Sequence, residues 1–441
     1  MKNQWNSTDR IIFHIDVNSA FLSWSAVKRL REDPNAADLR LIPSAVGGDV
    51  STRHGIITAK SIPAKKYGVT TGEPVVSALK KCPQLVLIPG DRATYREYSA
   101  DFISILKKYT DKVEKVSIDE AFLDMTDSAH LFASEIADGE PYPLCAARHI
   151  KDEIRDTLGF TVNVGISTNK ILAKMASDFE KPDKIHTLYP DEIQTKLWPL
   201  PVGSLFGCGS KTAEKLTGMG IRTIGELAQT EMGLLRSILG NKSAEYLYNN
   251  ANGISTSPVR TVREKAKSYS NETTTSEDIS DANYESIGLP IVRKLADSVA
   301  KRLKADGVRA FTVYVIVKTS EFARHTRQTT LTVSTNDPRV IRETAEQLMY
   351  ALLHGTEGLF SQGASMRLIG VGCSNIDREA YRQMDLFSWA ETKKAEDQKR
   401  EEQRKRELQI EEKKKKLDGM MEKVQRRYGE KSLRKGMHLP E

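Results

Sequence analysis

Val116-Ser-Ile-Asp-Glu-Ala-Phe-Leu-Asp-Met125 is the segment from which the rest of the sequence is best understood. It places two adjacent acids, Asp119 and Glu120, between apolar residues that favour strands. Neighbouring residues of a strand point to opposite faces, so both acids reach one site only from a strand end or a hairpin tip. Clustered carboxylates repel each other unless a cation neutralises them, and Mg²⁺ prefers such oxygen ligands. An isolated pair of acids is more often a solvent-exposed turn, so the prediction depends on a second acid-bearing strand.

A second strand with an acid at its end lies near the N-terminus. Residues 11–15 are mostly apolar and predict a buried strand, followed by Asp16, a turn and a helix over residues 20–30. Taken alone, Asp16 is equally consistent with a helix N-cap. The pattern then continues with a helix over 92–110, the acidic hairpin, a helix over 144–158 and a strand over 161–167. This order is typical of the βαββαβ arrangement, with helices on one face of an antiparallel sheet.

The βαββαβ arrangement brings the acids together. In it, Asp16 and the Asp119-Glu120 hairpin come from neighbouring central strands. Three carboxylates converging there are able to hold two cations, as at the site of a two-metal phosphoryl or nucleotidyl transfer.

Composition indicates a multidomain globular protein. A chain of 441 residues has room for several domains with hydrophobic cores, and 39% hydrophobic with 28% charged residues suits a soluble protein. The formal charge of +7 is a poor guide to nucleic-acid binding, because residues 391–441 hold 17 Lys/Arg and 12 Asp/Glu, a net +5. Local basic clusters must therefore support any such function.

Cysteine use and hydropathy predict a cytoplasmic location. The cysteines are widely spaced and form no CxxC pair, which fits a reducing compartment and argues against a disulfide framework or a zinc site: Cys82, Cys145, Cys208 and Cys373. The N-terminus is polar, and no stretch approaches the ~18 apolar residues of a membrane span. We expect no membrane partner.

Residues 31–88 are rich in Gly, Pro, Ser, Thr and Lys. Pro63 and Gly68 predict a short helix, and basic side chains that suit a phosphate group gather around it: Lys60, Lys65 and Lys66. Without context, a solvated lysine face is the preferred explanation of these residues. The phosphate interpretation therefore depends on the rest of the chain.

Residues 199–250 predict a small helical unit. Gly207-Cys-Gly-Ser-Lys211 and Gly218-Met-Gly-Ile-Arg222 each precede a helix, and Gly-x-Gly at a helix N-terminus lets backbone N–H groups approach a phosphate. This pattern favours a helix-hairpin-helix contact with the DNA backbone through Gly207, Gly209, Lys211, Gly218 and Gly220. The alternative is an ordinary turn between helices with glycine C-caps.

A second βαββαβ unit is predicted after residue 267. Its strands are expected at 268–274, 309–319, 325–333 and 366–373, with helices over 282–305 and 338–353. Basic and hydroxyl groups follow the middle strands, where they suit a nucleic-acid backbone lying across the sheet: Arg309, Lys318, Arg324, Arg327 and residues 329–332.

Three motifs now stand in order along the chain. They are Tyr95-Arg96-Glu97 with Ser99, then Ser117-Ile-Asp-Glu-Ala121, then Val164-Gly-Ile-Ser-x-Asn-Lys170 with Ala173-Lys174. In order and spacing they resemble the Y-family DNA polymerases of the bacterial DNA polymerase IV and UmuC type, over about residues 10–390.

The resemblance implies an α+β multidomain fold, a right-hand polymerase with a βαββαβ palm, small fingers, a helix-hairpin-helix thumb and a βαββαβ little finger. The implied parts are palm at 1–30 and 89–186, fingers at 31–88, thumb at 187–252, linker at 253–267, little finger at 268–378, a clamp-binding peptide at 379–390 and a charged helical or disordered tail at 391–441.

The resemblance also implies a catalytic centre. Asp16, Asp119 and Glu120 correspond to the metal-binding acids, and the backbone carbonyl of Val17 to a further ligand of two Mg²⁺ ions. The primer 3′-hydroxyl then attacks the α-phosphate of a dNTP, with one ion activating the hydroxyl and the other stabilising the leaving pyrophosphate.

Nucleotide selection is implied at three further positions. Phe21 corresponds to a steric gate against the ribose 2′-OH, and Lys65 and Lys181 to cations facing the triphosphate. The family often has a Tyr where this chain has Ile62, which cannot donate a hydrogen bond, and often an Arg at Lys65. Lysine supplies a point charge rather than a bidentate fork. These departures concern the fingers and leave the three acids unchanged.

Gln383-Met384-Asp385-Leu386-Phe387 resembles the peptide that binds the bacterial sliding clamp. Gln383 suits polar anchoring, and Leu386 and Phe387 suit an apolar pocket. The alternative is a chance amphipathic end to the domain. The implied partners are therefore primer–template DNA, dNTPs and the clamp, with the polymerase acting as a monomer.

The resemblance favours a template-directed, error-prone translesion DNA polymerase without proofreading. A non-catalytic, polymerase-derived adaptor that binds DNA and the clamp is the second hypothesis; Ile62 favours it, and the complete set of acids with Phe21 speaks against it. A nucleotidyl cyclase shares the acid-bearing palm but has no need of the predicted DNA-contacting units.

Overall fold

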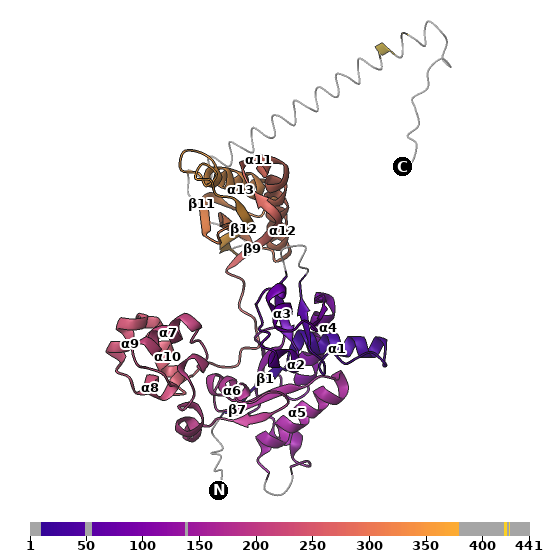
Figure 1. The fold of residues 1–441 in the computed structure, drawn as a ribbon, viewed down its shortest axis with the longest axis vertical. Coiled ribbons are helices and arrows are strands. Elements are labelled where there is room, and N and C mark those ends of the chain that lie inside the picture. The colour runs from indigo at the N-terminus through magenta and orange to yellow at the C-terminus, as the bar shows by residue number, and fades with distance from the viewer. Residues whose placement is uncertain (1–9, 49–54, 137–139, 379–418, 421–422, 424–441) are drawn as a thin grey trace. The chain divides into compact units, whose positions relative to one another are not determined.

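A computed structural model describes residues 10–48, 55–136, 140–378, 419–420 and 423. The chain divides into two compact units, residues 1–265 and 266–441, and the break falls inside the predicted linker (Figure 1). Within the described residues, none of the helices combines the length and the apolar character needed to cross a membrane. The predicted clamp-binding peptide and almost all of the tail lie outside the described residues.

A five-stranded sheet forms the centre of the first unit. Its strands lie in the order β5-β6-β1-β7-β8 and are β1 (Ile12–Val17), β5 (Val113–Lys115), β6 (Glu120–Asp124), β7 (Val162–Ser167) and β8 (Ile185–Thr187). Strand β1 pairs antiparallel with both β6 and β7, and Asp16 stands opposite Glu120. The prediction that the acid-bearing strands are central neighbours is thus confirmed.

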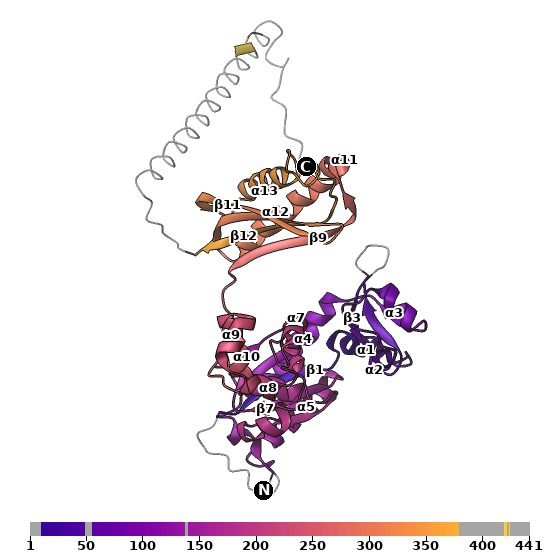
Figure 2. The same cartoon turned by 60° about the vertical axis from the view of Figure 1, so that its left-hand side comes forward.

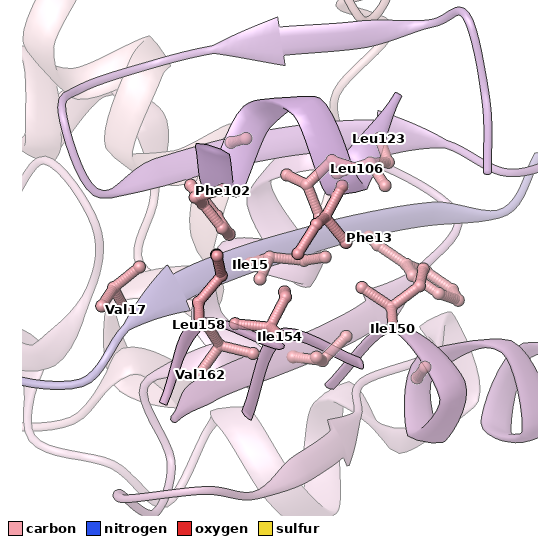
Figure 3. Packing of buried hydrophobic residues seen from close by; sticks show 14 of the residues in the cluster. Phe13, Ile15, Val17, Phe102, Leu106, Leu123, Ile150, Ile154, Leu158 and Val162 are labelled. Atoms are coloured by element: carbon pink, nitrogen blue, oxygen red, sulfur yellow. The ribbon is translucent and has the colours of Figure 1, made fainter. Parts of the chain in front are cut away.

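Helices α1 (Ala20–Glu32), α4 (Arg92–Leu106) and α5 (Tyr142–Leu158) cover one face of this sheet. Alternate residues of β1 point into the core, where they meet α4 and α5 (Figure 3): Phe13, Ile15 and Val17 against Phe102, Leu106, Ile154 and Leu158. Burying each such side chain contributes about 1.5–3 kcal/mol. A short 3₁₀ turn, Ala129–Phe132, lies in the loop before α5.

Helix α6 (Lys170–Ser177) lies on the opposite face of the sheet, where it buries Ala173 against Ile12 and Phe122. Gly165 of β7 makes this close approach possible, because a Cβ atom there would lie 2.0 Å from the carbonyl oxygen of Ala173. The sequence pattern did not show that this helix takes the second face.

The part predicted as fingers has its own small sheet in the order β3-β2-β4: β2 (Ser44–Gly47), β3 (Ile57–Lys60) and β4 (Val86–Ile88), with helices α2 (Ile62–Lys66) and α3 (Val75–Lys81). The predicted short helix exists and begins one residue earlier than expected, because the Ser61 side chain caps it by accepting the N–H of Ala64 at 3.1 Å.

The predicted helical unit follows. It contains the turns Pro190–Glu192, Ile193–Leu197 (π-helical) and Val202–Ser204, and the helices α7 (Ser210–Gly218), α8 (Ile224–Gln229), α9 (Met232–Leu239) and α10 (Asn241–Ala251). The turn between α7 and α8 uses Gly220 with φ 89°, a conformation that favours glycine. Thr223 and Glu226 form a capping box at the start of α8.

Residues 253–265, assigned to the linker from the sequence, pack against the palm. The carboxylate of Glu114 on β5 accepts the backbone N–H of Arg260 at 2.7 Å and pairs with Lys170 at 2.7 Å. This part of the linker therefore belongs to the first unit.

The second unit is a four-stranded antiparallel sheet in the order β11-β10-β12-β9. Its elements are β9 (Ser268–Ile279), α11 (Asp281–Asn283), the π-helical turn Tyr284–Gly288, α12 (Leu289–Ala305), β10 (Arg309–Thr319), β11 (Arg324–Thr335), α13 (Pro338–Leu353) and β12 (Met366–Asp377). Helices α12 and α13 cover one face (Figure 2). The helix predicted over 282–305 is interrupted near Pro290, which lacks the N–H that a continuous helix needs.

Candidate active site

The three predicted acids meet at the ends of β1 and β6. Asp16 and Glu120 are opposite each other in the strand register, and Asp119 directly precedes β6. The backbone N–H of Val17 donates to the carbonyl oxygen of Asp119 at 3.0 Å, which ties the two strand ends together. The structure therefore brings together the residues that the sequence placed in one centre.

Asp16 is the most buried of these acids, with 7% of its surface exposed. Burial raises the pKa of its carboxyl group; the ammonium groups of Lys181 and Lys174 oppose this effect, and Glu120 adds to it. Lys181 forms an ion pair with Asp16 and a second one with Asp178 at 2.9 Å. Burial works against the charged form of Lys181, but Asp16 and Asp178 together outweigh burial and raise the pKa of Lys181.

The other two acids have partners of their own. Glu120 pairs with Lys174 at 2.7 Å, and Asp119 accepts a hydrogen bond from the hydroxyl of Ser117 at 2.5 Å. Lys174 was not predicted as a site residue, although it lies in the Ala173-Lys174 motif. It sits on α6 and is almost fully buried, so its charge is directed at the acids.

The donor set fits hard divalent cations. Each acid is held by its own partner, and among the described residues no three His, Cys, Asp or Glu side chains stand close enough together to hold an ion in this arrangement. The acids nevertheless present only oxygen donors, and the ammonium groups of Lys174 and Lys181 now balance their charge. Magnesium takes carboxylate oxygens of this kind.

A buried amide network supports the loop that carries Lys181. Asn18 donates to the side-chain oxygen of Asn163 at 3.0 Å and accepts the backbone N–H of Asp183 at 2.9 Å. Asn163 in turn donates to the carbonyl oxygen of Ser177 at 3.1 Å. These asparagines position the loop, and the sequence analysis gave them no role; their place beside the acidic strand ends was the only signal.

A cleft of about 400 Å³ joins the acids to the fingers. Residues predicted from separate segments line it together: Asp16, Val17, Phe21, Ile62, Lys65, Asp119 and Lys181. Phe21 stacks on Tyr95 with ring centroids 4.7 Å apart and an interplanar angle of 23°. The Tyr95 hydroxyl also bonds to Ser25 at 3.0 Å, so the Phe21 ring has a fixed support.

The far wall of the cleft is basic. Lys60, which belongs to the basic cluster that the sequence suggested for a phosphate group, lines it beside Lys65. Burial and the nearby Lys65 ammonium lower the pKa of Lys60. Two neighbouring cations on one wall repel each other, so both gain when an anion binds beside them.

The glycine turns of the helical unit have the predicted placement. Gly209 caps α7 ahead of Lys211, and Gly218 with Gly220 forms the connection to α8. At Gly207, φ is 89° and a Cβ atom would lie 2.5 Å from the Tyr246 ring. Only glycine fits there.

The basic residues predicted on the second sheet do not share one face. In the strand register, Lys318 stands opposite Arg324 near one end of β10. Arg309 stands opposite Asp377 at the other end. Arg327 stands opposite the core residue Val315 and donates to the carbonyl oxygen of Ala351 in α13 at 3.1 Å. The period of two along β11 thus turns Arg327 toward the helices, which corrects the expected grouping.

The paired acidic strands, the basic wall across the cleft and the glycine-turn helical unit define a nucleotidyltransferase of the polymerase class. Models of the impB/mucB/samB family, of its C-terminal domain and of the DNA polymerase-iota thumb domain match residues 15–178, 266–386 and 203–255. The chain belongs to the impB/mucB/samB family, the Y-family DNA polymerases.

Individual relatives agree with this assignment. The DNA polymerase IV of Clostridium acetobutylicum is 41% identical over 381 residues, 86% of this chain and 90% of that protein. DNA polymerase IV 1 of Bacillus subtilis is 38% identical over 433 residues, 98% of this chain and 93% of that protein. A solved Y-family DNA polymerase chimera, 24% identical, has a TM-score of 0.68 and covers 83% of this chain and 99% of its own, a likeness of fold.

The family assignment confirms the expected activity. The chain is a DNA-directed DNA polymerase of the translesion type, and its substrates are DNA and nucleotides. Membership of the family also implies a dependence on divalent metal. The predicted α+β polymerase fold is confirmed as well.

Proposed function

We propose that Asp16, Asp119 and Glu120 are the catalytic carboxylates and that, with the Val17 carbonyl, they hold two Mg²⁺ ions. The observation that carries this proposal is the strand register, which sets Asp16 opposite Glu120 with Asp119 beside them. Bound there, the ions supply Lewis-acid activation of the primer 3′-hydroxyl and neutralise charge on the phosphates. The new O–P bond forms at the dNTP α-phosphate as pyrophosphate leaves.

The lysines around the acids divide into two groups. Lys174 and Lys181 contact the carboxylates directly and balance their charge while the protein is free of substrate. Lys60 and Lys65 line the opposite wall and offer positive charge to the triphosphate. Because Ile62 on that wall cannot donate a hydrogen bond, these lysines carry the phosphate contacts. Lys181 turns from Asp16 to the triphosphate when the nucleotide binds.

Phe21 acts as the steric gate. Its ring lines the same cleft as Asp16 and Asp119 and is held against Tyr95. A 2′-hydroxyl on an incoming ribonucleotide meets this ring, whereas the C2′ hydrogens of a deoxyribose leave it room. A rigid ring discriminates better than a mobile one, because yielding would remove the clash.

DNA is held outside the catalytic cleft. The turn before α7, with Gly207, Gly209 and Lys211, places backbone N–H groups at a helix N-terminus that suits a DNA phosphate. At the other end of α7, the N–H of Gly220 donates to the carbonyl of Thr217 at 3.0 Å, so Gly218 and Gly220 serve DNA by letting the backbone approach closely. The open face of the second sheet adds Lys318 and Arg324, opposite each other in register. Arg309, at the start of β10, is a further DNA contact, and Arg327 takes no part in DNA binding.

Residues Gln383–Phe387 bind the sliding clamp in this proposal. Support comes from the sequence of this peptide and from its place in the chain after β12 of the second unit. Deleting 383–387 should abolish capture by immobilised clamp while primer extension without clamp stays at the wild-type rate. A deletion variant that is still captured with undiminished affinity would end this assignment.

The polymerase otherwise works as a cytoplasmic monomer on the nucleoid.

The test of the catalytic assignment is primer extension by the full-length protein with four dNTPs and Mg²⁺, beside Asp119→Ala. We expect distributive extension by the wild type, none by the variant or in EDTA, and equal binding of primer–template by both proteins. Extension by Asp119→Ala would refute the assignment. A wild-type protein that binds DNA and clamp but extends nothing would favour the adaptor alternative.

A further inference from the structure

The hairpin between β10 and β11 ends in an exposed aromatic residue. Phe322 has 61% of its surface exposed, although it belongs to a residue type that is usually buried. It lies outside the helix-covered core of the second unit. Nothing in the catalytic cleft accounts for it.

The backbone at Phe322 is held in an unfavourable conformation. Its φ of 68° lies in the left-handed region, where a bulky residue with a Cβ atom is an outlier. The turn is well tied: the N–H of Phe322 donates to the carbonyl of Thr319 at 2.9 Å, and the N–H of Ser320 to that of Ser365 at 3.0 Å. Glycine or asparagine would meet this geometry at lower cost. The ring therefore calls for an explanation other than the turn itself.

Two cations lie close to the ring. The Lys318 ammonium lies 5.1 Å from the ring centroid and the Arg367 guanidinium 5.2 Å from it, both within cation–π range. They come from the neighbouring strands β10 and β12. The acids nearby are Glu321 in the turn and Glu272, which pairs with Arg324 at 3.4 Å. An exposed apolar ring with two positive charges against it is thus displayed at a turn held by backbone hydrogen bonds.

We propose that Phe322, Lys318 and Arg367 form a site for unpaired DNA, in which a base stacks on the ring and the cations bind its flanking phosphates. Proteins that bind single strands combine aromatic platforms with positive charge in this way, and duplex bases are already stacked on one another. The two cations favour a nucleic acid over an apolar protein partner, because phosphates neutralise their charge and an apolar surface does not. A template is single-stranded ahead of the primer end, so a polymerase always has such a ligand. This inference rests on the proposed DNA-holding function of the second unit and deepens it.

The test uses fluorescence anisotropy of the full-length protein with a short labelled oligo(dT) and with an abasic strand of equal length, which keeps the phosphates and lacks the bases. Phe322→Ala should weaken oligo(dT) binding about fivefold or more and leave abasic binding unchanged. Phe322→Trp should bind oligo(dT) about as tightly as the wild type, because it keeps an aromatic ring for stacking. Lys318→Ala and Arg367→Ala should weaken the binding of both oligonucleotides, because the Lys318 and Arg367 side chains contact phosphates, which both strands have. Tyr350→Ala, which removes another exposed aromatic from α13, is the matched control and should change neither.

A structural role for the ring gives a different pattern. If Phe322 only held the turn, Phe322→Gly would lower the unfolding temperature, whereas relief of the left-handed strain should leave that temperature within a few degrees of wild type. The proposal fails if Phe322→Ala binds oligo(dT) like the wild type, or loses both ligands equally. A wild-type protein that binds neither oligo(dT) nor primer–template would refute the DNA-holding function itself.

Discussion

The two βαββαβ units share one order of elements and pair their strands differently. In the palm the first strand, β1, lies between β6 and β7, whereas in the second unit the first strand, β9, lies at the sheet edge beside β12. The central strands of the second sheet are instead β10 and β12. The succession of helices and strands along a chain therefore leaves open which strand is protected on both sides.

The two pairings suit two tasks. A central strand holds its end residues between two neighbours, and Asp16 at the end of β1 is almost fully buried as a result. Such a position keeps carboxylates at a set spacing. The second sheet leaves one face free of helices, and that face carries Lys318 and the exposed ring of Phe322. An open face suits a long polymer ligand.

Two glycines give the strongest way to test this difference. In the palm, a Cβ atom at Gly165 would lie 2.0 Å from the backbone oxygen of Ala173, so Gly165→Ala should cost about 3 kcal/mol or more. On the second sheet, the atoms nearest to a Cβ atom at Gly372 belong to the outer end of the Tyr314 ring, at 2.3 Å, and Tyr314 is a partly exposed side chain rather than backbone. Gly372→Ala should therefore cost about 1 kcal/mol.

Denaturant unfolding of the full-length protein, followed for each unit by a local fluorescence probe, measures both costs. Equal destabilisation by Gly165→Ala and Gly372→Ala would show that the second face of the palm sheet is as tolerant as the open sheet. That result would contradict the close contact between α6 and β7.

Phe21→Ala sharpens the comparison at the catalytic end. Removing the ring should raise ribonucleotide incorporation relative to deoxyribonucleotide about tenfold or more, because the 2′-hydroxyl loses its obstacle. Ile62→Ala, on the opposite wall, should leave this ratio unchanged and serves as the control. Unaltered sugar selection in Phe21→Ala would remove Phe21 from the gate. Single-nucleotide incorporation with paired rNTP and dNTP measures the ratio.

Lys318→Ala and Arg327→Ala compare the two faces of the second sheet. Losing one phosphate contact should weaken primer–template binding a few fold and reduce the slope of log affinity against log salt by about 1. Arg327, turned toward α13, should give neither effect. A salt slope that falls for Arg327→Ala and not for Lys318→Ala would reverse the assignment of the faces.

Much of the palm could be predicted from sequence. Buried strands followed by acids, and helices with apolar stripes between them, determine the arrangement that brings Asp16 to Glu120. The motifs around Asp119 and Lys170 then identify the family. The capping box at Thr223 is equally local, because it depends on residues three apart.

The remaining features depend on register and on packing across the sheet. Arg327 and Lys318 lie on opposite faces of the second sheet, and which face meets the helices depends on the pairing of β10 with β11 and the packing of α13 on them. Lys174 reaches Glu120 because α6 lies on β7, a contact that Gly165 permits without any local signal in the sequence. Pairings between distant segments of this kind leave no periodic pattern.

Single-turnover nucleotide incorporation and primer–template affinity, measured side by side for Asp119→Asn and Lys318→Ala, test the division of labour most directly. Asparagine keeps the size of the side chain and removes its charge. We predict that Asp119→Asn lowers the incorporation rate by roughly 1,000-fold or more with unchanged affinity, since loss of metal-ligand charge acts on the transition state. Lys318→Ala should lower affinity and leave the rate of bound complexes intact. An Asp119→Asn protein that incorporates nucleotides at the wild-type rate would contradict the account.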